Sequence, residues 1–244
     1  MKISFIIPAY NEENYIAHCL KSLLAETKKR PYDIEVIVVN NSSTDRTGEI
    51  ARSFPGVKVV DEPKKGLPSA RQRGLMEAQG ELLAYIDADT RMHDKWFPMM
   101  EKVMFRHPDV VSYSGPYKYY DASKIKSIVL ELLWKTSAPV GYKLSGYAIL
   151  GGNFIAKKEA LVKMGGFDTN IIFYGEDMDI AKRLSKFGKV KFDMNFFIYT
   201  SSRRFQKHGI IKVSWLYTVN FIWQVLFSKP YTVDFDHAKE YDGQ

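Results

Sequence analysis

Short apolar runs alternate with longer amphipathic segments through the first third of the chain. The runs have the length of buried strands, and the segments between them carry apolar residues at helical spacing. This alternation predicts an α/β fold with a mostly parallel, Rossmann-like sheet flanked by helices and joined by right-handed crossovers. The predicted strands are residues 3–7, 34–39, 57–60 and 82–86, and the predicted helices between and after them end near residues 24, 54 and 79.

The pattern becomes less regular after residue 115, where aromatic residues, lysines and glycines interrupt it and indicate loops. We divide the chain into residues 1–115, 116–205 and 206–244. The remaining predicted elements are helices at 94–106, 124–134, 157–164 and 176–187, a strand at 110–114, one or two strands within 190–199, and a C-terminal amphipathic helix at 210–227.

The composition of the 244-residue chain fits one large α/β domain, because 45% of its residues are hydrophobic. The net charge of +7 favours anionic partners, such as nucleotide phosphates or an acidic membrane surface. No long basic block and no nucleic-acid-binding motif accompany this charge, so we expect no nucleic acid partner. The single cysteine, Cys19, lies on an apolar helical face, which predicts a buried packing role.

Two carboxylates follow the fourth predicted strand, in Asp87-Ala88-Asp89. Residues two apart in an extended chain point the same way, so both side chains can face one ligand. Paired oxygen ligands suit a hard cation such as Mg2+ or Mn2+, which in turn binds a diphosphate. An Asp-rich turn without metal is the alternative for so short a motif. Further polar clusters at residues 8–13 and 40–45 share this sheet edge if the strands are parallel.

Seven short stretches occur together in the order of a known family, across roughly residues 3–205. Together they make the chain resemble a family 2 glycosyltransferase with the GT-A fold. The resemblance implies transfer of one sugar from a nucleotide donor, usually with inversion, by a nucleotide-sugar-binding half (1–115) and an acceptor-binding half (116–205). The stretches are Pro8-Ala9-Tyr10-Asn11-Glu12, Ser43-Thr44-Asp45, Ala70-Arg71 with Gly74, Asp87-Ala88-Asp89, Gly151-Gly152-Asn153, Gly165-Gly166-Phe167-Asp168 and Gly175-Glu176-Asp177.

The same resemblance implies roles for four acids. Asp89 is the expected main ligand of Mg2+ or Mn2+, with Asp87 also at the metal and nearer the nucleotide. Asp177 is the expected general base that takes the proton of the acceptor hydroxyl, and Glu176 is its orienting neighbour. Acids in the first turn of a helix also simply stabilise the helix dipole, which is the alternative for the last two.

Further donor-binding residues are implied by the resemblance. Arg71 is the expected diphosphate contact. Many GT-A enzymes bring a C-terminal Arg or His back over the donor phosphates, so Arg204 is a candidate phosphate contact and His208 a candidate metal ligand. The implied donor-binding residues are Pro8, Tyr10, Glu12, Asn40, Asp45, Arg71, Asp87, Gly152, Asn153 and Arg204.

Two departures from the family pattern limit what the resemblance implies. Asn40 stands where the family usually has the aspartate that recognises the base, so a UDP-sugar and a GDP-sugar both remain open as donors. No Gln-x-x-Arg-Trp motif of processive synthases is present, which favours transfer of a single sugar. The rival functions are a catalytically silent nucleotide-sugar-binding module and a nucleotidyltransferase. The second would need a Gly-rich basic loop after the first strand, where residues 8–12 do not supply one.

The apolar segment at 210–227 has three interpretations. It would be roughly 27 Å long as a helix, which is marginal for a membrane span. It packs on the catalytic domain, contacts a second copy in a homodimer, or lies on a membrane surface near a glycan or lipid-linked acceptor. The first apolar run ends at Pro8 and is too short for a signal peptide. We therefore expect a cytoplasmic protein, at the cytosolic face of a membrane if the third interpretation holds.

Overall fold

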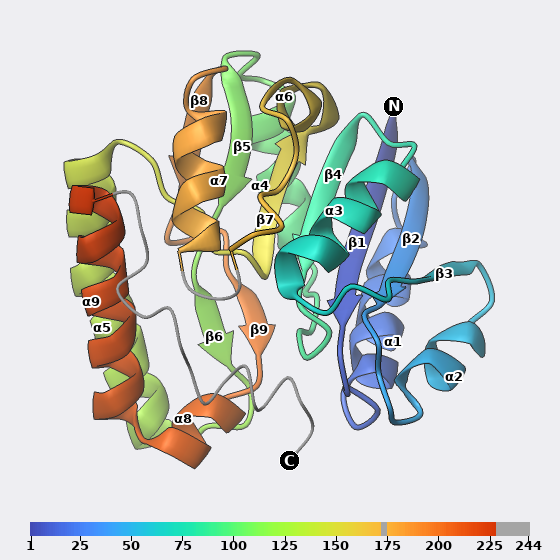
Figure 1. Cartoon of the computed structure of the whole chain (residues 1–244), viewed down its shortest axis with the longest axis horizontal. Coiled ribbons are helices and arrows are strands. Elements are labelled where there is room, and N and C mark those ends of the chain that lie inside the picture. The colour runs from blue at the N-terminus through green and yellow to red at the C-terminus, as the bar shows by residue number, and fades with distance from the viewer. Residues whose placement is uncertain (172–174, 228–244) are drawn as a thin grey trace.

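A computed structural model describes residues 1–171 and 175–227 of the chain (Figure 1). The expected α/β fold is confirmed, and the predicted strands are all present. Within the described residues, the strands are β1 (Lys2–Ala9), β2 (Asp33–Asn40), β3 (Val57–Asp61), β4 (Leu82–Ile86), β5 (Val110–Ser114), β6 (Tyr117–Tyr119), β7 (Asn153–Lys157), β8 (Lys189–Phe192) and β9 (Ile198–Thr200).

The helices also follow the predicted order, with two differences: α8 (Arg203–His208) was not predicted, and α5 is longer than predicted. The helix expected at 124–134 continues through Pro139 to Ser145. It ends at Gly146, which adopts a left-handed conformation with φ 77°. The C-terminal helix matches its prediction, while residues 228–244 lie outside the described part. The helices are α1 (Ile16–Thr27), α2 (Thr47–Arg52), α3 (Leu67–Glu77), α4 (Trp96–Met104), α5 (Lys124–Ser145), α6 (Lys158–Lys163), α7 (Glu176–Leu184), α8 (Arg203–His208) and α9 (Ile210–Phe227).

The main sheet has seven strands in the order β3-β2-β1-β4-β7-β5-β8. Parallel pairing among β1 to β4 brings the carboxyl ends of these strands to one edge, where Ala9, Asn40 and Asp61 are neighbours. Strand β7 runs antiparallel between β4 and β5, with Asn153 opposite Ile86. The loop that enters β7 therefore reaches the edge that carries the end of β4.

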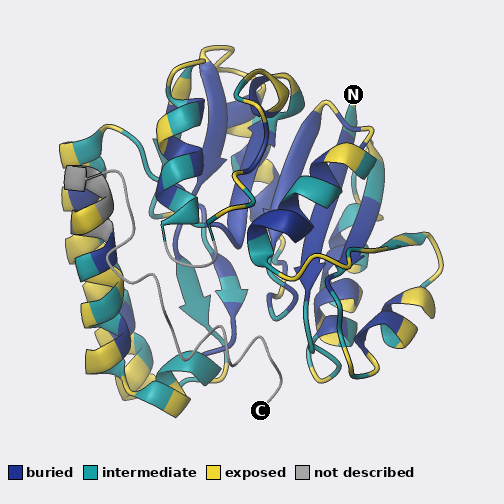
Figure 2. Ribbon diagram, viewed as in Figure 1, coloured by how far each residue is buried: buried dark blue, intermediate teal, exposed yellow. Residues whose placement is uncertain are grey.

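The sheet is covered on both faces by apolar side chains. On β1, Ile3, Phe5 and Ile7 pack into one cluster and Ile6 into the other, as alternation along a strand requires. Cys19 is buried in the first cluster, which confirms its predicted packing role. Figure 2 shows this buried sheet and, at the left edge of the view, the largely exposed helices α5 and α9.

Candidate active site

Asp87, directly after β4, is held by a tyrosine that the sequence interpretation did not identify. The Tyr117 hydroxyl donates a hydrogen bond to Asp87 Oδ2 at 2.9 Å and accepts one from the Gly152 backbone N–H at 3.0 Å. Burial, reinforced by the charge of Asp87, raises the pKa of Tyr117 well above its usual value, so the phenol keeps its proton. Tyr117 thus connects the loop before β7 to the Asp-x-Asp motif.

Asp177, in the first turn of α7, is bonded through both carboxylate oxygens. Arg71 Nη1 donates to Oδ1 at 3.1 Å, and the Gly151 backbone N–H donates to Oδ2 at 2.8 Å. The Arg71 side chain is 2% exposed, and its Nη1 also lies 4.0 Å from Glu176 Oε1. The predicted phosphate contact, the predicted base and its neighbour therefore form one cluster.

The protonation of these acids is shifted by their surroundings. Burial raises the pKa of Asp177, and the guanidinium of Arg71 opposes that shift. Burial and the charge of Asp177 raise the pKa of Glu176 to about 7. A carboxyl group with a raised pKa is a better proton acceptor than a free one, which suits the base role predicted for Asp177.

The two glycines before β7 are required because neighbouring side chains lie too close to the backbone there for a Cβ atom. A Cβ at Gly151 would overlap with the Arg71 guanidinium and with Asp177 Oδ1. A Cβ at Gly152 would overlap with the Asp87 carboxylate and with the Tyr117 hydroxyl. No side chain fits at either position, so the Gly151 N–H reaches the Asp177 carboxylate and the Gly152 N–H reaches the Tyr117 hydroxyl that holds Asp87.

Asp89 faces a positive charge. It accepts a hydrogen bond from Thr200 Oγ1 at 3.0 Å, and Arg203 Nη2 lies 3.3 Å from its Oδ2. The same guanidinium forms a bidentate pair with Glu12, whose pKa burial raises to about 7 despite this pair. Burial likewise raises the pKa of Asp89, and Arg203 opposes it. The end of β1, the end of β4 and the start of α8 meet here.

The donor atoms at this point fit a divalent cation bound together with a diphosphate. Among residues 1–171 and 175–227, no group of three or more acids, histidines or cysteines forms a complete metal cage. Mg2+ bound with nucleotides commonly takes only one or two carboxylates and completes its coordination with phosphate oxygens and water. Asp87 and Asp89 supply such a pair. His208 lies in the last turn of α8, roughly 140° around the helix axis from Arg203.

Two predicted donor-binding side chains serve the local structure. Asn153 is fully buried; its amide accepts from Trp96 Nε1 at 3.0 Å and donates to two backbone carbonyls. Asp45 accepts from the Glu13 backbone N–H and from Thr47 at the start of α2. These bonds fix the loops after β1 and before β7. The donor-binding role proposed for these two positions stays a prediction.

Asn40 is paired with an acid on the neighbouring strand. Its Nδ2 donates to Asp61 Oδ1 at 2.8 Å, and Arg52 Nη2 reaches the same carboxylate at 2.7 Å. Its Oδ1 is buried and has no hydrogen-bond partner among the residues the structure describes. An amide thus stands where the family usually has an aspartate, and one of its N–H groups is used in the bond to Asp61. Tyr10, the other residue predicted here, lies under the Lys65 ammonium, 5.5 Å from its ring centre.

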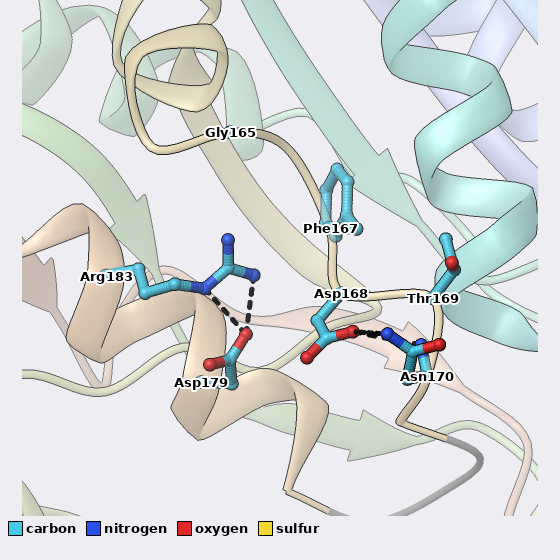
Figure 3. Close-up of a pocket in the computed structure, with 7 residues that line it drawn as sticks. All are labelled: Gly165, Phe167, Asp168, Thr169, Asn170, Asp179 and Arg183. Atoms are coloured by element: carbon cyan, nitrogen blue, oxygen red, sulfur yellow. Dashed lines mark hydrogen bonds and ion pairs between the residues drawn. The ribbon is translucent and has the colours of Figure 1, made fainter.

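A separate pocket of about 390 Å3 opens beside the loop after α6 (Figure 3). Its polar groups bond to one another: Asp168 with Asn170, and Arg183 with Asp179. Asp179 and Asp177 are two positions apart on α7, about 200° around the axis. This pocket therefore opens on the other side of α7 from the candidate base.

The comparison with known families agrees with this arrangement. Residues 4–165 match the family described as Glycosyl transferase family 2, and residues 133–203 match one described as the N-terminal domain of galactosyltransferase. Because the first match covers more than half of the chain, the protein belongs to glycosyl transferase family 2.

The chain is similar to part of several curated proteins that are named as glycosyltransferases. The chain is 36% identical over 121 residues to the uncharacterized glycosyltransferase EpsJ of Bacillus subtilis, covering 48% of this chain and 34% of that protein. It is 28% identical over 205 residues to the probable glycosyltransferase YdaM of the same species, covering 77% and 47%. The chain thus spans less than half the length of these two relatives.

Solved structures share the fold, which confirms the predicted GT-A architecture. The mannosyltransferase PcManGT from Pyrobaculum calidifontis, in complex with GDP-Man and Mn2+, superposes with a TM-score of 0.65 at 18% identity, over 98% of this chain and 68% of that chain. Glucosyl-3-phosphoglycerate synthase from Mycobacterium tuberculosis, in complex with Mn2+, UDP-glucose and phosphoglyceric acid, gives 0.58 at 19%, over 92% and 79%. At these identities the likeness concerns the fold.

Proposed function

We propose that this protein is a metal-dependent, inverting glycosyltransferase that moves one sugar from a UDP- or GDP-sugar to a hydroxyl or phosphate of an acceptor. The observation that carries the proposal is the shared loop before β7. Gly151 holds Asp177, and Gly152 holds Asp87 through Tyr117. A candidate base and a candidate metal carboxylate are therefore kept in fixed relation on either side of one loop.

The proposed chemistry uses these groups in order. Asp177 accepts the proton of the acceptor hydroxyl while the acceptor oxygen forms a bond to the anomeric carbon. The bond from that carbon to the phosphate oxygen breaks, and its electron pair leaves with the diphosphate. Mg2+ or Mn2+ at Asp89 and Asp87 would neutralise the charge of that leaving group. Arg71 keeps Asp177 oriented, and its positive charge would stabilise the phosphates of the bound donor.

The donor and metal assignments are supported by what neighbours bind. The Pyrobaculum enzyme binds GDP-Man and Mn2+, and the mycobacterial synthase binds UDP-glucose and Mn2+. We carry over a divalent metal and a nucleotide-sugar, with residues 1–115 as the donor half and 116–205 as the acceptor half. Asn40 in place of the family's aspartate leaves the choice of base to experiment.

The acceptor assignment extends to a lipid-linked glycan at a cytosolic membrane face. No helix in the described residues is long and apolar enough to cross a membrane. Helix α9 buries Val213 and Asn220 against the domain, while Ile211 and Trp215 are 87% and 69% exposed. Packing on the domain thus accounts for one side of α9. Its exposed side supports peripheral membrane contact or a homodimer, which remain predictions.

A panel of UDP-, GDP- and dTDP-sugars tests the proposal by thermal stabilisation and donor hydrolysis, each with Mn2+ and with a chelator. We expect one nucleotide class to stabilise the protein and to be turned over only with metal. Stabilisation without turnover, in the presence of acceptor mimics, would instead identify a silent binding module. Formation of a nucleotide-sugar from sugar phosphate and nucleoside triphosphate would identify a nucleotidyltransferase.

A further inference from the structure

We propose that helix α5 rests on an anionic lipid surface through one apolar stripe. Five large side chains along the helix are more than half exposed, although each would gain by leaving water. Together they form what we call the α5 stripe: Ile125 (77% exposed), Ile128 (67%), Leu132 (61%), Val140 (58%) and Leu144 (75%).

The members of the stripe lie on one side of the helix. They recur at intervals of three, four and eight residues, which keeps them on one side of an α-helix. The residues that α5 buries, Leu130 and Gly141, point to the other side, toward the domain. The helix has 22 residues and is about 33 Å long, so the exposed face extends along it and is not an isolated contact point.

The charges around the stripe indicate the kind of partner. Four exposed lysines lie along α5, whereas Glu131 is its single acid and pairs with Lys135 at 3.6 Å. Lysines beside exposed apolar residues suit a surface where apolar side chains enter the lipid and ammonium groups meet anionic headgroups. The lysines are Lys124, Lys126, Lys135 and Lys143.

A second copy of the chain fits this surface less well. A two-fold contact that placed one α5 against the other would bring the lysines of both copies together. Like charges so placed repel each other, and Glu131 is already engaged with Lys135. A bilayer with anionic lipid has no such conflict.

Helix α9 carries similar exposed residues at the same end of the molecule. Ile211 and Trp215 are largely exposed beside the exposed Lys212. In the shared view of Figures 1 and 2, α5 and α9 both appear at the left, outside the main sheet, with exposed residues along both. The lipid-facing surface therefore centres on α5, and α9 adds to it.

Helix α5 is connected to the candidate active site through Trp134, which lies on the side of the helix away from the stripe. The Trp134 ring meets the Tyr117 ring edge-on at 6.4 Å, and its Nε1 donates to the Tyr119 hydroxyl at 3.4 Å. Tyr117 in turn holds Asp87. A helix that lies on lipid would therefore place the acceptor half of the site, through β6, close to the headgroup layer.

Vesicle flotation tests the inference on the full chain without donor or metal. The probes are phosphatidylcholine vesicles with and without phosphatidylglycerol. We expect binding only to the anionic vesicles, and at least a tenfold loss of binding in the variant Ile128→Ser/Leu132→Ser/Leu144→Ser. A matched control, Met76→Ser/Val162→Ser, changes two exposed apolar residues on α3 and α6 and should bind like the wild type.

The controls keep the result interpretable. Circular dichroism and thermal stabilisation by nucleotide-sugar show whether the stripe variant folds. The variant Lys126→Glu/Lys143→Glu reverses two charges and keeps all five residues of the stripe. It should also lose its binding to anionic vesicles. The inference fails if the wild type does not float, or if the folded stripe variant floats equally well. It also fails if only Ile211→Ser/Trp215→Ser abolishes binding, or if the wild type is a dimer that the stripe substitutions convert to monomer.

Discussion

Arg203 Nη2 lies 3.3 Å from Asp89 Oδ2, so a guanidinium faces the carboxylate expected to bind the metal. The two residues are far apart in sequence and meet because α8 follows β9, which holds Thr200 against the same carboxylate. Arg203 is fixed on its other side by Glu12 and lies over the ring of Tyr15, 4.5 Å from its centre. A metal at Asp89 must therefore share the carboxylate with this cation or displace it.

We expect Arg203→Gln to bind Mn2+ about threefold or more tightly in the absence of donor. The substitution removes the repulsion between the Arg203 guanidinium and the cation, which is on the order of 1 kcal/mol. Calorimetric titration with Mn2+ alone measures this. The melting temperature should fall, since Glu12 loses its partner inside the protein. Weaker Mn2+ binding in a folded variant would mean that Arg203 positions Asp89 for the metal.

Asp177→Asn should lose about 100-fold or more in transfer while still binding the nucleotide-sugar, because the base acts on the acceptor. Both oxygens of Asp177 accept from donors, so the new amide must face either Arg71 or Gly151 with the wrong group. Melting curves with donor should therefore accompany the rates. Asp179→Asn is the matched control on the same helix, and it should keep transfer. Near-normal transfer by a folded Asp177→Asn would remove the base assignment.

The first half of the fold could be predicted because short stretches of sequence are enough to identify its strands. The strands before Asp87 are continuous apolar runs bounded by polar turns, and parallel order places their ends together without further knowledge. Strand β7 is different: its antiparallel position between β4 and β5 depends on long-range pairing, which no local pattern encodes. The approach of Gly152 to Asp87 follows from that pairing.

The candidate site residues Tyr117 and Arg203, to which the sequence analysis gave no role, share this cause. Tyr117 stands in an irregular aromatic stretch, where nothing distinguishes it from Tyr119 until β6 is paired with β9. Arg203 and Arg204 are adjacent, and the choice between them depends on the residue at which α8 begins. Pro139 and Gly141 disfavour a helix interior, so the local pattern does not predict that α5 continues to Ser145.

Stability should depend on pH through Glu176, whose pKa rises from 4.5 to about 7 on burial beside Asp177. The folded state binds this proton more tightly than the unfolded chain. Its contribution to stability is therefore complete below about pH 4.5 and is lost as pH rises through 7. Glu176→Gln cannot titrate, so its melting temperature relative to wild type should rise across that interval. A difference that does not change with pH would contradict the raised pKa.

Gly152→Ala should abolish transfer, because its Cβ would displace the Tyr117 hydroxyl and the Asp87 carboxylate. Tyr117→Phe removes the hydroxyl without adding volume, and we expect a smaller loss, about tenfold, for one hydrogen bond to a charged group. Rates at saturating metal, together with Mn2+ titrations, measure both variants. Equal activity of Gly152→Ala and wild type would mean that the loop does not approach Asp87 in solution.

Asn40→Asp restores the residue usual in the family, yet the structure predicts that it destabilises this chain. Asn40 Nδ2 lies 2.8 Å from Asp61 Oδ1, so the substitution replaces a hydrogen bond with two facing carboxylates. The loss of that bond and the new repulsion should lower the free energy of unfolding by about 1–2 kcal/mol at pH 7. Urea unfolding measures it, and the loss should shrink in acid, when the two groups share a proton.

The reciprocal exchange Asn40→Asp/Asp61→Asn separates stability from base recognition. It rebuilds the hydrogen bond with donor and acceptor reversed, so most of the lost stability should return. If Asn40 also contacts the base, the relative affinity for UDP and GDP should change by about 0.5–1.5 kcal/mol, because position 40 then offers only acceptors. Titration of both nucleotides into the stable double variant decides the matter. An unchanged affinity ratio there would place base recognition elsewhere on the sheet edge, with Asn40 serving only to pair β2 with β3.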